Sequence, residues 1–143
     1  MSINRNLANF ATKVTSDGNS YITITVTVAG GKFVIDGTSQ QIVSLAKGQT
    51  YRFDNSDSSN SGHPFVFSTD SSNSSAFTTG VSTNGTAGSS GAYVEVTLEQ
   101  DAPDRIFYYC SNHSGMGAMV KTAPVGDANF ATFVDTFTFP TSD

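Results

Sequence analysis

A run of ten residues, YYCSNHSGMG, concentrates groups that bind transition metals. It contains Cys110, which is the one cysteine of the chain, one of the two histidines, His113, and the thioether of Met116. Thiolates and thioethers are soft ligands and imidazole is a borderline one, so these three side chains suit copper, zinc or a related metal. Their spacing, C-x2-H-x2-M, places all three within one loop and indicates a metal site.

The second histidine, His63, precedes a strand-like stretch well upstream, in YRFDNSDSSNSGHPFVF. Two imidazoles, one thiolate and a weak thioether are the ligand set of a blue-copper site, with the sulfur of Met116 on the axis. Zinc or Cu(I) can use the same ligands. The alternative is that Cys110 is a small buried hydrophobe and that His113 only bonds the loop backbone. We favour the metal because every Cys and His of the chain falls within the pattern.

The elements that must position these residues are predicted to be strands. In YITITVTV, from Tyr21 to Val28, apolar and polar residues alternate with a period of two, as in a half-buried strand. The segment 68–91 is rich in Ser, Thr and Gly, and most of it is predicted to be a surface loop anchored by Phe77 and Val81. Strand spacing of this kind predicts an all-β sandwich or barrel. Further strands are expected at 33–35, 41–45, 50–54, 64–68, 92–98, 105–110 and 117–121.

The stretches YRFDNSDSSNSGHPF and CSNHSGM together resemble the cupredoxin family, over roughly residues 21–121. The resemblance implies a cupredoxin-like Greek-key β-sandwich with copper as cofactor. Its metal ligands would be His63, Cys110, His113 and Met116. In one respect the chain departs from the family, where an Asn often supplies a backbone N–H to the thiolate: this position is Pro64, which has no N–H. Because surrounding hydrogen bonds tune metal affinity and potential, the support of the thiolate must differ here.

The two ends of the chain are predicted to be extensions of the sandwich. Residues 1–20 form an N-terminal arm or a short helix, residues 21–123 the sandwich, and residues 124–143 a C-terminal arm or strand. A helical face of Ile3, Leu7, Phe10 and Val14 favours the helix, although an extended arm fits equally. We interpret Met119 as a core residue. The C-terminal segment is too apolar for a free tail, because it contains Phe130, Phe133, Phe137 and Phe139, which must be buried against this domain or against a neighbour. We expect it to pack on a neighbouring subunit or virion protein.

Composition excludes several classes of protein. The 143 residues carry a net charge of −5 without a basic cluster, which argues against a nucleic-acid partner. No apolar run approaches the roughly 20 residues of a membrane span, and the N-terminus lacks the apolar core of a signal peptide. No paired carboxylates are apparent, and a Ser-His-Asp arrangement is implausible with both histidines engaged. We therefore predict that the protein is not an enzyme and stays in the compartment where it is made.

Two function classes remain, an electron carrier and a structural protein. The phrases SSNSGHPFVFST, TTGVSTNGTAGSSGAYVEVT and IFYYCSNHSGMG resemble cupredoxin-like modules in virion proteins of marine phages, especially cyanophages. The opening NRNLANFATKVTSDGN resembles the N-termini of phage tail and fibre proteins. This resemblance implies a homo-oligomeric virion component, a capsid decoration or cement protein or a tail or fibre part, bound to other virion proteins and made in the host cytoplasm. On sequence alone we favour this reading. The alternative is a small blue-copper electron-transfer protein.

Overall fold

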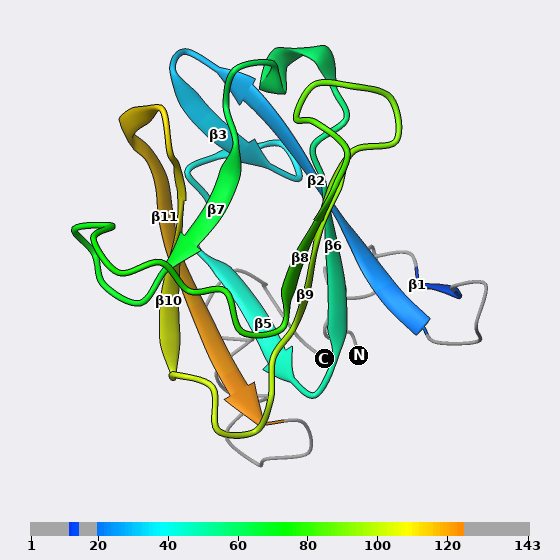
Figure 1. Cartoon of the computed structure of the whole chain (residues 1–143), viewed down its shortest axis with the longest axis vertical. Coiled ribbons are helices and arrows are strands. Elements are labelled where there is room, and N and C mark those ends of the chain that lie inside the picture. Colours follow the sequence, from blue (N-terminus) through cyan, green and yellow to red (C-terminus); the bar gives the residue numbers. More distant parts are fainter. Residues whose placement is uncertain (1–11, 15–19, 125–143) are drawn as a thin grey trace.

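The computed structural model of the chain describes residues 12–14 and 20–124, which form two β-sheets that face each other (Figure 1). The larger sheet has the order β4-β3-β2-β6-β9-β8, and β1 pairs with β2. Its strands are β1 (Thr12–Val14), β2 (Ser20–Ala29), β3 (Lys32–Ile35), β4 (Thr38–Ser39), β6 (Thr50–Asp54), β8 (Val81–Asn84) and β9 (Tyr93–Thr97). The smaller sheet has the order β5-β11-β10-β7, with β5 (Val43–Lys47), β7 (Phe65–Ser68), β10 (Arg105–Cys110) and β11 (His113–Pro124).

The predicted alternation along β2 is confirmed. Ile24 and Val26 are fully buried between the sheets, whereas Thr25 between them is exposed. Successive side chains of a strand point to opposite faces, so this pattern fixes which face of β2 meets the core. The strand then pairs in parallel with β6 and antiparallel with β3, which places it in the middle of the larger sheet.

A cluster of aromatic rings fills the space between the sheets. Phe65 lies at its centre, with ring centroids 5.0 Å from those of Phe33 and Phe53, 5.4 Å from Phe67 and 5.2 Å from Tyr108. All five rings are at most 2% exposed. Burial of each such side chain stabilises the fold by roughly 1.5–3 kcal/mol, so this cluster holds the two sheets together.

The prediction of a loop over residues 68–91 is wrong for Val81–Asn84. These residues form β8, which pairs antiparallel with β9 at an edge of the larger sheet. Only Val81 is partly buried there, so the composition of this edge strand resembles that of a solvated loop. Phe77 does anchor the segment as predicted, because it is 8% exposed and its N–H donates to the carbonyl oxygen of Phe67 at 2.9 Å.

Met119 is a second correction, because it is half-buried and lies outside the core. It pairs with Phe107 across β10 and β11, on the opposite face from the buried Val120. The apolar character of methionine gives no sign of this; the alternation of the strand decides it.

At the N-terminal end, Thr12–Val14 pair with the start of β2, so Val14 lies in a strand. The other residues of the predicted helical face, and the C-terminal segment with its phenylalanines, lie outside the described residues. Within the described part of the chain, no helix has the length and apolar character of a membrane span.

Candidate metal centre

Cys110 occupies the last inward-facing position of β10. The strand alternates between exposed or half-buried and buried residues, and Cys110 ends it at 3% exposure. The pairing of β10 with β11 shifts register between Tyr108 and Cys110, so that Cys110 comes to lie opposite His113. A side chain at Gly117 would overlap the carbonyl oxygen of Tyr108, so only glycine allows this close approach of the two strands. The tight hairpin thus brings a thiol and an imidazole together.

His63 reaches the same point from a turn that follows η1 (Ser58–Asn60), a 3-10 helix capped by Asp57. The backbone N–H of His63 donates to the carbonyl oxygen of Asn60 at 2.8 Å. The fully buried side chain of Asn60 donates to the carbonyl oxygen of Val26 at 2.8 Å, which ties the turn to β2. The strand that follows the turn, β7, pairs with β10 so that Phe65 lies opposite Cys110. His63, two residues before Phe65, is thereby held beside the thiol.

The three ligand atoms face one another. The Sγ of Cys110 lies 3.7 Å from Nδ1 of His63 and 3.7 Å from Nδ1 of His113, and the ligand atoms of all three residues lie within 4.8 Å of one another. The bond lengths typical of zinc, about 2.3 Å to a thiolate and about 2.0 Å to an imidazole nitrogen, separate sulfur and nitrogen by about 3.7 Å at a trigonal angle of about 120°. The two observed sulfur–nitrogen separations therefore fit one metal ion that Cys110, His63 and His113 would hold together.

The fourth predicted ligand, Met116, lies in β11 three residues after His113. It is 2% exposed and belongs to the same buried cluster as Cys110. Two nitrogens, a thiolate and a thioether in this order are the donor set of a type 1 copper site, so the residues present fit copper. Among the described residues, His63, Cys110 and His113 are the one cluster of three metal-ligating groups of the kinds His, Cys, Asp and Glu.

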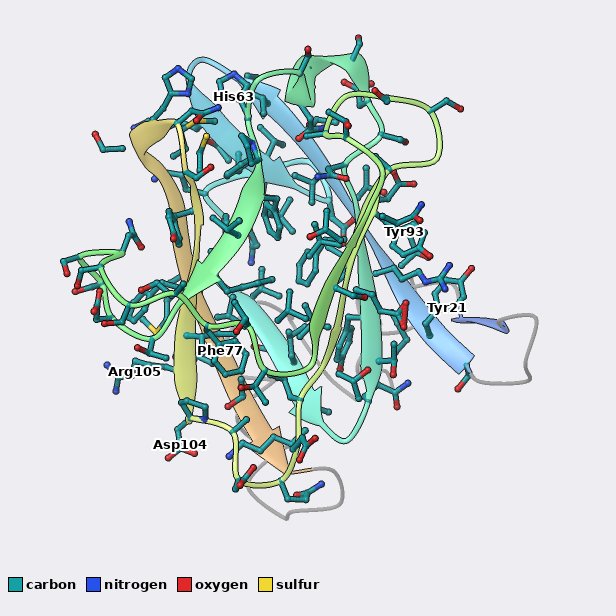
Figure 2. The ribbon with its side chains drawn as sticks, viewed as in Figure 1. Tyr21, His63, Phe77, Tyr93, Asp104 and Arg105 are labelled. Carbon is teal, nitrogen blue, oxygen red and sulfur yellow. The ribbon has the colours of Figure 1, made fainter. Side chains whose placement is uncertain are left out.

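The centre lies at one end of the sandwich. In Figure 2, His63 is beside the connection between β10 and β11, and Asp104 and Arg105 are at the opposite end of the molecule. Cys110 is buried, His63 is half-buried and His113 is exposed. A metal held here would therefore be shielded from water by its sulfur side and would be accessible through the ring of His113.

The thiol of Cys110 has no backbone donor in the residue that follows His63. Pro64 follows His63 and has no N–H to donate to the thiolate. Within the described part of the chain, the hydrogen-bonding contacts of Sγ are those with the two imidazoles.

Beneath the site, burial raises the pKa of Tyr108, and its hydroxyl donates to the carbonyl oxygen of Gln41 at 2.7 Å. Tyr108 is thus a neutral phenol that braces the smaller sheet.

Four polar residues that the sequence did not single out contact the two ligand loops. The amide of Asn112 donates to the carbonyl oxygen of Gly62 at 3.0 Å and joins the loop of His113 to the turn of His63. Asn60 bonds that turn to β2, and Lys32 and Gln40 contact the first residues of β11, on either side of Met116. Polar residues in turns have no periodicity, and so no signal in the sequence marks these contacts.

Comparison with known proteins gives one family match. A model described as "Copper binding proteins, plastocyanin/azurin family" matches residues 22–125. No curated protein sequence matches the chain.

Among solved structures the chain is similar to rusticyanins. Rusticyanin from Thiobacillus ferrooxidans is 13% identical, with a TM-score of 0.45, over 82% of this chain and 90% of that chain. A structure described as the copper protein rusticyanin is 16% identical, with a TM-score of 0.46 and the same coverage. Reduced rusticyanin is 15% identical, with a TM-score of 0.45, over 82% of this chain and 92% of that chain.

Proposed function

The chain belongs to the plastocyanin/azurin family of copper-binding proteins, and from this premise we propose that it is a small blue-copper protein that carries single electrons. The predicted all-β, cupredoxin-like Greek-key sandwich is confirmed, and the ligand set of the sequence analysis fits copper. The function that the geometry supports best is therefore the electron-transfer alternative, which the sequence alone ranked second.

One observation carries the proposal: the sulfur of a buried cysteine faces two imidazoles, one of which is exposed. Copper bound to His63, Cys110, His113 and Met116 would supply one-electron chemistry between Cu(I) and Cu(II). The protein excludes water from the sulfur side of the site, because Cys110 is 3% and Met116 2% exposed. The ring of His113 gives a redox partner an edge to approach.

The same residues hold the site rigid. Cys110 lies on a strand paired on both sides, with β7 and with β11. His63 is fixed by the N–H bond to Asn60, and the two ligand loops are joined through Asn112. A ligand frame that cannot relax holds one geometry for both oxidation states, which suits rapid electron exchange.

The test is to load the purified full chain with Cu(II) and to record its visible spectrum. We expect an intense thiolate-to-copper band that disappears on chemical reduction and returns on oxidation. Cys110→Ser should remove the band, and Ser111→Ala, the neighbouring exposed position, should retain it. If wild type binds Cu(II) without this band, or if the band does not cycle, the electron-carrier proposal is wrong.

The virion context stays a prediction. It rests on resemblances of sequence phrases and on terminal arms that lie outside the described residues, and the family match is to copper-binding proteins. No feature of the described sandwich favours a capsid or tail role. Copurification with phage particles is the measurement that tests it.

A further inference from the structure

The start of β11, which carries His113 and Met116, is attached to the larger sheet by two side chains. The ammonium Nζ of Lys32 donates to the carbonyl oxygen of Gly115 at 2.9 Å. The amide Nε2 of Gln40 donates to the same oxygen at 3.2 Å and to the carbonyl oxygen of Gly117 at 2.8 Å. Lys32 begins β3 and Gln40 follows β4, so both contacts cross from one sheet to the other.

The two carbonyl groups flank Met116 directly. Glycine on each side gives this part of the loop more conformational freedom than any other residue would. Gly115 uses that freedom, because its φ is 77°. Hydrogen bonds to the carbonyl oxygens before and after Met116 remove this conformational freedom. They thereby determine where the backbone of Met116 lies relative to Cys110 and the two histidines.

Gln40 is itself held in an unusual conformation. Its φ is 49°, in the left-handed region that glutamine rarely adopts, and its N–H donates to the carbonyl oxygen of Phe33 at 2.8 Å. Such a conformation persists where surrounding contacts fix it. The next residue, Gln41, provides a natural contrast, because within residues 12–14 and 20–124 its amide bonds only the carbonyl oxygen of its neighbour Ile42, at 3.0 Å.

Lys32 adds charge to the same contact. Its bond to Gly115 is charge-assisted and therefore stronger than a bond between neutral groups. A fixed positive charge at this end of the molecule also disfavours the more positive oxidation state of a nearby metal. The residue is half-buried, but the bond itself is exposed to water, so screening keeps this effect small.

We propose that Gln40 and Lys32 are positioning residues of the metal centre, which hold Met116 in place through the carbonyl groups of Gly115 and Gly117. Gln40 sets the affinity for the metal, and Lys32 in addition shifts the equilibrium toward the reduced form. This inference rests on the proposed function in its use of copper, but the positioning applies equally to zinc.

The test compares Gln40→Met with Gln41→Met in the full-length protein. Methionine has nearly the shape of glutamine and donates no hydrogen bond, so both variants lose one amide at adjacent positions. We expect Gln40→Met to lower the affinity for Zn(II) and Cu(I) by about 10-fold to 100-fold, the usual effect of losing a partner of a metal ligand. It should also speed amide hydrogen exchange of Met116 in the metal-free protein. Gln41→Met should stay within about twofold of wild type in both measurements.

Lys32→Met and Lys32→Arg together distinguish the effect of the charge of Lys32 from the effect of its side-chain shape. Lys32→Met should shift the Cu(II)/Cu(I) equilibrium toward Cu(II) by about threefold, the size expected for a charge near the protein surface. Lys32→Arg keeps the charge and should restore most of the wild-type potential.

The proposal is overturned if Gln40→Met and Gln41→Met have equal metal affinities. It is also overturned if Gln40→Met lowers only the free energy of unfolding of the metal-free protein, because the role is then structural. A wild type that binds Zn(II) and Cu(I) but lacks the reversible blue band refutes the electron carrier alone. A wild type that binds none of these ions refutes both.

Discussion

Replacing Asn60 by alanine should destabilise the protein through the turn that carries His63. The side chain is fully buried, and its Nδ2 donates to the carbonyl oxygens of Val26 at 2.8 Å and Asp57 at 3.2 Å. Each bond contributes about 1 kcal/mol, and leaving the buried oxygen of Val26 without this partner costs about 1 kcal/mol more. The Oδ1 of Asn60 has no hydrogen-bond partner among the described residues, so its removal offsets about 1 kcal/mol. The expected net loss is about 2 kcal/mol.

Urea unfolding of the metal-free protein measures this loss. Ser58→Ala is the matched control, because Ser58 is exposed in the same 3-10 turn, and it should change stability by less than about 0.5 kcal/mol. Asn60→Ala should also weaken Zn(II) binding, since the carbonyl oxygen of Asn60 accepts the N–H of His63. A loss in Asn60→Ala no larger than that in Ser58→Ala would refute the idea that this amide ties the ligand turn to β2.

Two further predictions concern the core. Phe65→Ala should lower the free energy of unfolding by roughly 3–5 kcal/mol, because four rings lose their common neighbour. Phe107→Ala, on the half-buried outer face, should lower it by less than half as much, and urea unfolding of both variants measures the difference. Burial raises the pKa of Tyr51 from 10.0 to about 12, so the folded state disfavours the phenolate, and the stability that this group contributes below pH 10 should be lost as the pH rises through 12. The loss in unfolding free energy is roughly 3 kcal/mol for Tyr51. Tyr51→Phe should therefore flatten the alkaline part of a plot of unfolding free energy against pH. An unchanged slope would contradict the attribution of this pH dependence to Tyr51.

The sequence by itself determined the chemistry of the centre and the class of fold. All cysteine and histidine residues of the chain fall into one ligand pattern. The chemistry of these side chains then limits the candidate metals to copper and to metals that use the same ligands, such as zinc. The alternation in β2, and in most other strands, was also readable, because a strand with one buried face must repeat every two residues. Where the outer face is polar and the strand lies at an edge, as in β8, this signal disappears and the sequence reads as a loop.

Only the tertiary structure decided what surrounds the ligands. The pairing of β7 with β10 brings His63 to Cys110, and the crossing between sheets brings Lys32 and Gln40 to the loop of Met116. These contacts join residues far apart in the chain, and those of Lys32 and Gln40 depend on a few individual hydrogen bonds. A hydrogen bond depends on position and direction within tenths of an ångström, which composition and periodicity do not encode. The fold supplies that precision, and with it the frame that a metal at this site requires.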